Sequence, residues 1–586
     1  MHIVAGTLLV LLTWAVAAAL LAGLGFLPSV LTSTSDERSS LVRRAMWWGV
    51  LLVALFCMLI NLVQPLRSLA TGIVLLVLVA VSTGCGILVL RIRPMERAYR
   101  APSSWSSRLL GLALVLAVVF LSIAALGPIT NYDSGLYHLG AVQYAGDYRT
   151  IPGLANLYFA YGYGNAEFPL AALLGNGPWN GNGFRLLNGL LIALAATDVF
   201  LRFRERRGAG FYILFVGVIT LLVPMLALAD YWVTSPSQDS AVFTVTVIAS
   251  AYLADAVSAS KRWISSACVV LVLSALLVLL RPTMVAFAVV VVIVICMHWS
   301  RNRGSVSGLQ LASAMVVVGV VTIASAAAAV TRDIVLSGWL QYPLSIHPFD
   351  VAWRAFDPVA QRLATLGYHR NASDLWDAAQ SWAWIPGWFS RIWTQWETYE
   401  FLFLTAVATL GLIIVVRTSG LRLRWRAMLL VMAPSIASLA VWFLFTPPAF
   451  RFTWGALFMI PAILLGWTLW RVERIAATRE ELVRVAELAL AAGGVFVIGI
   501  VGFCTLTRLH PSSMTEEKTW SLGIDITYSQ APIPTSQMST QTLPSGLQVQ
   551  VPVQSEQCWL QFPLCSPGVN SSLRLRGTEL QEGLLP

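Results

Sequence analysis

Charged residues are scarce in this 586-residue sequence, because Asp, Glu, Lys and Arg together make up only 11% of it. A typical soluble domain has about 25% charged residues, so this scarcity excludes an ordinary water-soluble protein. Hydrophobic residues make up 57% of the chain, and many of them stand in long uninterrupted runs. Runs of about twenty residues can cross a hydrocarbon core of roughly 30 Å as helices. The composition therefore predicts an integral membrane protein.

The sequence also lacks the motifs that bind nucleotides or transition metals. It has neither GxxxxGK[ST] nor a GxGxxG that follows a strand, which argues against ATP-driven transport and against use of a cytosolic sugar nucleotide. It has no HExxH and no close cluster of His and Cys, so we expect no transition metal. A divalent cation held by Asp133 and Asp239 stays open as an alternative. We otherwise expect no cofactor and no nucleic-acid partner.

The apolar runs predict an all-α polytopic membrane protein, since a helix satisfies its own backbone polar groups in lipid. About fourteen spans are expected, centred near residues 15, 54, 79, 118, 192, 219, 247, 272, 290, 320, 408, 436, 461 and 496. The predicted organisation is N-terminal spans (1–129), a first large loop with an interfacial helix (130–183), a helical bundle (184–331), a Trp-rich loop (332–400), C-terminal spans (401–506) and a small tail (507–586).

Arginine predicts the orientation in the membrane. The net charge of +10 comes almost wholly from arginine, which gathers after the odd-numbered spans in SDERSSLVRR, RIRPMERAYR, RFRERR, SASKRW, HWSRNRG, RTSGLRLRWR and RVERIAATREELVR. Cytoplasmic loops are enriched in Lys and Arg. The pattern therefore predicts a multi-pass protein of the plasma (inner) membrane with both termini extracytosolic. The first apolar run has no preceding Lys or Arg and is too long for a signal peptide, so we expect a retained span.

The cysteines divide into two groups. Five of the seven lie inside predicted spans, where Cys acts as a small apolar residue: Cys57, Cys85, Cys268, Cys296 and Cys504. Cys558 and Cys565 lie in the tail, in QCWLQFPLCSP, and outside the cytoplasm they could form a disulfide or stay free. The tail is rich in Ser, Thr, Pro and Gln, which predicts a small β-containing or loop-rich appendage.

The stretch NYDSGLYHLGAVQYAGDYRTIPG, residues 131–153, is the first long interruption of the apolar runs. If the chain is helical after Asp133, its tyrosines form one stripe, as in a helix that lies in the membrane interface. Either Asn131 or Asp133 is expected to be the N-cap of this helix, and Asp133 is alternatively a general base; the two roles of Asp133 are compatible. For His138, a polar anchor or a substrate contact is favoured over a base.

An acid at the end of an early span, followed by an interfacial helix on the outer face, resembles the first extracytosolic loop of the GT-C glycosyltransferases. These include the dolichyl-phosphate-mannose protein mannosyltransferases and the bacterial lipid A aminoarabinose transferases, which take a sugar from a polyprenyl-phosphate carrier. The resemblance implies a GT-C-like fold, a catalytic role for Asp133, and substrate contacts from Tyr137 and His138. The loop lacks the paired Asp-Glu of the protein mannosyltransferases, so their acceptor chemistry is not carried over.

Two further segments resemble GT-C patterns. RFTWGALFMIPAILLG, residues 451–466, is similar to the Arg-aromatic sequence before a late span, which implies that Arg451 approaches the carrier phosphate. LLRPTMVAF resembles a basic-Pro-Thr turn of some of these enzymes, which implies that Arg281 is a second candidate for binding the carrier. A second outer acid is expected from Asp239, with Asp230 as the alternative. Ordinary roles as snorkelling arginines or helix caps compete with each of these interpretations.

Several stretches together resemble a bacterial family of large membrane proteins of unknown function. They are NYDSGLYHLGAVQYAGDYRTIPGLAN, TSPSQDSAVF, SGWLQYPLSIHPFDVAW and QCWLQFPLCSPGVNSSLRLRG. This likeness covers most of the chain and implies no activity.

These patterns favour a transferase that moves a sugar from a polyprenyl-phosphate carrier to an envelope acceptor. Its expected partners are the lipid-linked sugar and the bilayer. The alternatives are a transporter or flippase of lipid-linked glycans, a polymerase or ligase, and a purely structural membrane protein. The tryptophans of loop 332–400 suit an aromatic belt or sugar stacking, and the belt is favoured.

Overall fold

The computed structural model describes residues 2–34, 40–92, 105–205, 208–223, 232–258, 263–302, 307–419, 425–476, 513–521 and 524–586, with short pieces between 493 and 506. Within these ranges, twelve helices are long and apolar enough to span a membrane. They are α1 (His2–Leu24), α3 (Leu41–Ile60), α4 (Leu69–Ile92), α5 (Trp105–Ala124), α8 (Leu187–Glu205), α10 (Gln238–Ser258), α11 (Trp263–Leu280), α12 (Val285–Arg301), α13 (Gly308–Ser337), α17 (Trp396–Ser419), α18 (Trp425–Phe445) and α19 (Trp454–Ala476).

The all-α polytopic fold is therefore confirmed, and twelve of the expected spans are found. The span expected near residue 219 is the shorter α9 (Ala209–Val223), of 15 residues. The span expected near residue 496, and with it Cys504, lies largely outside the described residues. Each of the seven arginine-rich stretches also falls at least partly outside them, so the orientation in the membrane stays a prediction.

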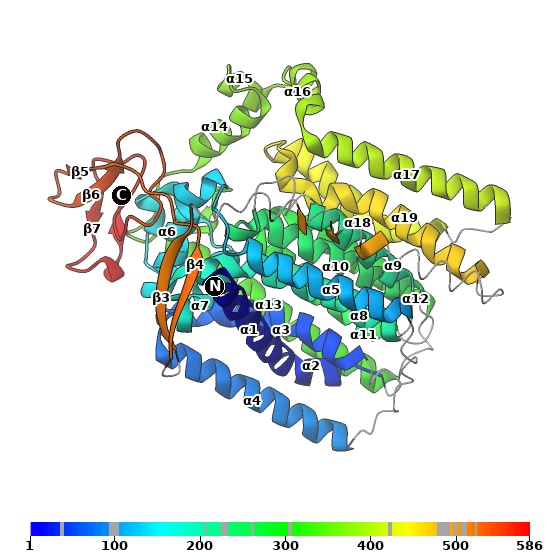
Figure 1. Ribbon diagram of the computed structural model, residues 1–586. Coiled ribbons are helices and arrows are strands. Elements are labelled where there is room, and N and C mark those ends of the chain that lie inside the picture. Colours follow the sequence, from blue (N-terminus) through cyan, green and yellow to red (C-terminus); the bar gives the residue numbers. More distant parts are fainter. Residues whose placement is uncertain are drawn as a thin grey trace.

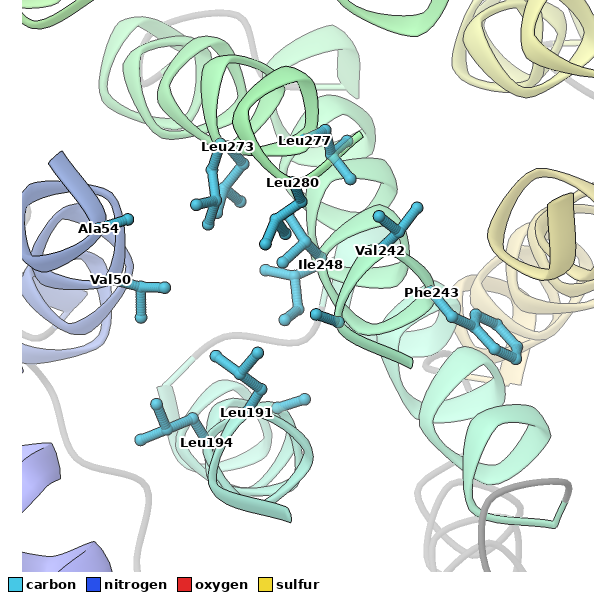
Figure 2. Close-up of a cluster of buried hydrophobic side chains, with 14 of the residues drawn as sticks. Val50, Ala54, Leu191, Leu194, Val242, Phe243, Ile248, Leu273, Leu277 and Leu280 are labelled. Atoms are coloured by element: carbon cyan, nitrogen blue, oxygen red, sulfur yellow. The ribbon is translucent and has the colours of Figure 1, made fainter. Parts of the chain in front are cut away.

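The helices differ in how much of their surface is covered by protein. In the most apolar 18-residue stretch of α10, 89% of the residues are buried, whereas the corresponding figure for α17 is 11%. Figure 2 shows the centre of the bundle, where Val50, Leu191, Ile248 and Leu273 come from α3, α8, α10 and α11 and point toward one another. A helix that is apolar all round is either buried or lipid-facing, so α10 is a core helix and α17 presents its apolar surface outward.

Small residues let two of the helices approach closely. A Cβ atom on Gly49 of α3 would lie 1.9 Å from the carbonyl oxygen of Leu21 in α1. A Cβ atom on Gly25, which ends α1, would lie 2.0 Å from the carbonyl oxygen of Ala45. Glycine is therefore required at both positions, as is common where membrane helices cross.

The segments outside these helices gather toward one end of the bundle, at the left and top of Figure 1. These segments contain α6 (Leu139–Asp147), α7 (Glu167–Leu174), α14 (Val359–Arg370), α15 (Leu375–Gln380), α16 (Ile385–Arg391) and the hairpin β1 (Trp339–Gln341)–β2 (Ile346–Pro348). The short helix α2 (Phe26–Leu31) is an exception, because it follows α1 at the other end of the bundle. The tail forms three antiparallel pairs: β3 (Thr515–Ser521) with β4 (Ile524–Gln530), β5 (Met538–Thr542) with β6 (Gln548–Pro552), and β7 (Arg574–Leu575) with β8 (Leu584–Leu585). The expected β-containing tail is thus present.

Candidate functional site

Four segments far apart in the sequence meet at this end of the bundle. Asp133 precedes a single π-helical turn, Ser134–His138 (η2), and Asp239 lies in the first turn of α10. Arg281 is the extended residue that separates α11 from α12, where Pro282 cannot continue the helix. Arg451 lies in a 3₁₀ turn, Phe450–Thr453 (η12), that leads into α19. Their charged groups form two adjacent ion pairs.

The first ion pair joins the carboxylate of Asp133 to Arg451, with 3.0 Å between Oδ2 and Nη1. Asp133 occupies the N-cap position of η2, but its side chain makes no capping hydrogen bond. The side chain of Asn131 accepts the backbone N–H of Asp133 instead, at 2.9 Å. Of the two caps considered from the sequence, Asn131 therefore takes the role, and the Asp133 carboxylate faces the guanidinium.

The second ion pair joins Arg281 to Asp239. Arg281 also donates from Nη1 to the carbonyl oxygen of Phe452, at 2.8 Å. The guanidinium carbons of Arg281 and Arg451 lie 5.3 and 5.0 Å from the centre of the Phe452 ring. One aromatic ring therefore gathers two arginines, whose charges are balanced by two carboxylates.

His138 and Tyr137 form the buried side of this cluster. The ring of His138 lies 3.5 Å from the hydroxyl of Ser235, which in turn is 2.6 Å from the hydroxyl of Ser134. Burial lowers the pKa of His138 to about 3, so the ring is neutral at pH 7. Burial, with the charge of Asp133, raises the pKa of Tyr137 well above its ordinary value. Both side chains therefore offer neutral hydrogen-bonding groups.

Glu167, the first residue of α7, was missed in the sequence. It is 0% exposed, and neither carboxyl oxygen has a hydrogen-bond partner among the described residues. Its neighbour Phe168 packs against the rings of Tyr137 and His138, at 6.0 and 5.5 Å. Burial, and then the charge of Asp239, raises the pKa of Glu167 to about 8, so this carboxyl is mostly protonated at pH 7. The only signal in the sequence was that no other charged residue stands between Arg149 and Arg185.

The Trp-rich loop contributes a second residue that the sequence did not reveal. His369, near the end of α14, contacts the Phe452 ring at 5.5 Å between ring centres. Burial and the charge of Arg451 lower the pKa of His369 to about 4. Of the tryptophans, Trp384 and Trp388 pack near Phe443, whereas Trp376 and Trp393 are exposed. Exposed rings suit the belt, and His369 is the loop's contact with the charged cluster.

The expected acid pair does not converge on one point. Asp133 and Asp239 each face their own arginine. Within the described part of the chain, no group of three or more His, Cys, Asp or Glu side chains is placed to hold a metal ion. Asp230, the alternative second acid, lies outside the described residues.

The loop after Asp133 differs from a single amphipathic helix. The π turn inserts an extra residue before α6, and most of α6 is buried. Tyr137 contacts Tyr163 and Phe168, whereas Tyr144 contacts Tyr161 and a tail residue, Phe562. The expected tyrosine stripe is therefore divided between two clusters, because a π turn changes the register.

A second group of charges is buried at the opposite ends of α8 and α10. Asp198 accepts hydrogen bonds from Trp47 and Arg202, both at 2.7 Å, and lies 3.6 Å from Arg43. Arg202 also pairs with Asp255. These charges pair with one another, which is the usual condition for ionisable residues inside a membrane bundle.

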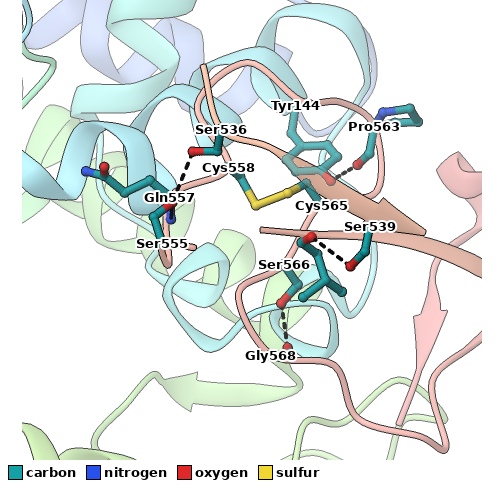
Figure 3. The surroundings of a disulfide bond; sticks show 11 residues. Tyr144, Ser536, Ser539, Ser555, Gln557, Cys558, Pro563, Cys565, Ser566 and Gly568 are labelled. Carbon is teal, nitrogen blue, oxygen red and sulfur yellow. Dashed lines mark hydrogen bonds between the residues drawn. A yellow bond between two sulfur atoms is a disulfide. The ribbon is translucent and has the colours of Figure 1, made fainter. Parts of the chain in front are cut away.

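Cys558 and Cys565 form a disulfide in the tail (Figure 3), with 2.04 Å between the sulfur atoms. This resolves the alternative that the sequence left open.

The fold and the site define a polytopic helical membrane protein with a cluster of paired acids and arginines at one end. More particularly, the chain belongs to the family described as "Domain of unknown function (DUF8201)", whose model matches residues 8–458. The match contains Asp133, Glu167, Asp239, Arg281 and Arg451, and ends before the tail. No curated protein matches the chain.

Proposed function

We propose that this protein is a GT-C-like glycosyltransferase that moves a sugar from a polyprenyl-phosphate carrier to an envelope acceptor on the extracytosolic face. The observation that carries the proposal is the pairing of Asp133 with Arg451 beside Arg281, with both guanidinium groups on the Phe452 ring. Phosphate is bound well by arginine, because the guanidinium fork matches two phosphate oxygens.

The two arginines act on the carrier. In the proposed reaction, the carrier phosphate binds between Arg281 and Arg451. It replaces the Asp133 carboxylate as the ion-pair partner of Arg451. Its negative charge grows as the bond from the anomeric carbon to the phosphate oxygen breaks, and the two arginines stabilise that charge. Asp133, released from Arg451, is then free to accept a proton.

Asp133 acts on the acceptor. The acceptor hydroxyl oxygen forms the new bond to the anomeric carbon, its proton passes to Asp133, and the carrier phosphate leaves with the bonding electrons. His138 is uncharged at neutral pH and holds a sugar hydroxyl as a hydrogen-bonding partner, and Glu167, which is mostly protonated, lies behind it on the buried side of the site. A site that mixes charged groups for the reacting atoms with neutral ones for the hydroxyls suits a sugar phosphate.

The test is to profile envelope polymers and lipid-linked sugars by mass spectrometry in strains with wild type, a deletion, Asp133→Asn and a matched control. Asp147→Asn is the control, because Asp147 lies in the same loop and pairs with an arginine, Arg67, at 2.8 Å. Asp133→Asn should insert normally, lower transfer about 10²- to 10⁴-fold, and cause the lipid-linked donor to accumulate. Asp147→Asn should resemble wild type.

The rival functions give different profiles. A flippase defect would trap the lipid-linked sugar on the cytoplasmic face, and a polymerase or ligase defect would leave complete repeat units on the carrier. If Asp133→Asn matches wild type while the deletion changes the profile, Asp133 is not the base and the transferase proposal fails.

A further inference from the structure

The tail covers the loop that contains Asp133. We define the tail loop as residues 556–565, which the disulfide between Cys558 and Cys565 closes. Gln557 donates a hydrogen bond to the carbonyl oxygen of Tyr132, at 2.9 Å, and Glu556 accepts one from the Tyr132 hydroxyl, at 3.0 Å. The tail loop thus binds the residue directly before Asp133.

A second contact lies just after Asp133. The backbone N–H of Trp559 donates to the carbonyl oxygen of Gly135 in the π turn, at 2.9 Å. A Cβ atom on Gly135 would lie 2.7 Å from the indole ring of Trp559. Glycine at 135 therefore lets the ring lie directly on the backbone of the π turn. Trp559 itself is buried and has a φ of 51°, an uncommon conformation for a residue other than glycine.

A third contact holds α6. The Tyr144 hydroxyl donates to the carbonyl oxygen of Pro563, as Figure 3 shows. The ring of Phe562 lies 4.8 Å from that of Tyr144 and 5.8 Å from that of Tyr148. The tail loop therefore contacts the segment 132–148 before, within and after the π turn.

The disulfide keeps the tail loop in this shape. On one side of the loop, the backbone of Gln550 in β6 bonds to Leu564 and Ser566, at 2.8 and 3.1 Å. The bridge connects this anchored side to Cys558, directly before Trp559. Without the bridge, the side that carries Trp559 keeps its contacts with residues 132–148 and the bond from the backbone N–H of Gln557 to Ser555, but it loses its covalent link to the anchored side. We therefore expect this side and the residues that it contacts to loosen together.

We propose that the disulfide-closed tail loop is a redox-sensitive brace that positions Asp133 opposite Arg451. An external dithiol would open the brace: the S–S bond breaks, Cys558 and Cys565 each become a thiol, and the dithiol becomes a disulfide. Trp559 is then a positioning residue for the proposed reaction, so this inference rests on the proposed function for its catalytic meaning. The mechanical part can be tested without it.

The experiment measures hydrogen–deuterium exchange of the purified full-length protein in lipid nanodiscs, with and without a dithiol. Peptides covering 131–148 should exchange at least about tenfold faster after reduction and recover after reoxidation. The double variant Cys558→Ser, Cys565→Ser should exchange fast in both conditions. Peptides from α14 should stay unchanged as the internal control. Unchanged exchange in 131–148 after complete reduction would overturn the proposal.

A pair of Trp559 variants separates positioning from general damage. Trp559→Phe keeps a ring on Gly135 and should retain slow exchange and, in cells, the wild-type glycan profile. Trp559→Ala should lose both. If the two variants behave alike, the ring does not position the loop and the proposal fails. If the exchange results hold but wild type and deletion strains have the same glycans, the brace stands and the transferase function fails.

Discussion

Glu167 presents the clearest energetic problem at the scale of single residues, because its buried carboxyl group has no hydrogen-bond partner in the part of the chain that the structure describes. Its pKa is raised from an ordinary value of 4.5 to about 8 by burial and by Asp239. Between these two values, the folded protein holds a proton that the unfolded chain has released. The free energy of unfolding therefore falls as the pH rises from about 4.5 to about 8.

Replacing Glu167 with Gln should remove this pH dependence. The wild-type melting temperature should fall between pH 5 and pH 8 by more than that of Glu167→Gln, since the amide has no proton to lose. Thermal unfolding of the protein in nanodiscs at the two pH values measures both slopes. Asp350→Asn, at an exposed position, is the control and should keep the wild-type slope. Parallel slopes for wild type and Glu167→Gln would mean that Glu167 does not hold a proton.

The residues of the site were predictable to different degrees. Asp133 was identified because its loop is the first long interruption of the apolar runs, and Asp239 was expected as a second acid on the same face. Arg281 and Arg451 were proposed from the resemblance of their segments to GT-C patterns. The pairing of these acids with these arginines could not be predicted, because it depends on how distant helices pack. Glu167 was missed for a related reason: a single acid in an apolar loop gives no pattern, and its meaning comes from burial.

At the scale of elements, the close crossing of α1 and α3 depends on the absence of side chains. Gly49→Ala should push the helices apart, since the added carbon would overlap the carbonyl oxygen of Leu21. We expect a loss of about 1–3 kcal/mol, which is typical of overpacking. Thermal unfolding and the yield of monodisperse protein measure it. Gly84→Ala in α4 is the matched control, because no neighbouring atom of the described segments lies within 4 Å of the added carbon. Equal stability of the two variants would contradict the close contact between α1 and α3 at Gly49.

The helices were easier to predict than the loop beside the site. A span is defined by length and apolarity, which are local properties of the sequence, and twelve of them were found where expected. The π turn after Asp133 was not predicted, because the spacing of Tyr137, Tyr144 and Tyr148 also fits a regular helix. The residue that packs on this turn, Trp559, lies far along the chain, so its contact with Gly135 could not be read from the local spacing.

At the scale of the whole molecule, polar chemistry is separated between the two ends of the bundle. One end holds the cluster around Asp133 and Arg451 and is covered by the tail with its disulfide. The other end holds the paired charges around Asp198. Disulfides persist in oxidising compartments, so the bridge agrees with the extracytosolic orientation that the arginine-rich stretches predict.

This orientation predicts opposite accessibility for two exposed serines. Ser572 lies in the tail, and Ser300 lies near the end of α12 that points away from Arg281. In spheroplasts, a membrane-impermeant maleimide should label Ser572→Cys directly and Ser300→Cys only after permeabilisation. The background replaces Cys504 and the two free cysteines that are exposed among the described residues, Cys85 and Cys296, by Ser. Direct labelling of Ser300→Cys but not of Ser572→Cys would show that the orientation in the membrane is the opposite of the predicted one. It would put the site in the cytoplasm, where a lipid-linked donor on the outer face could not reach Asp133, so the transferase proposal would fall together with the orientation.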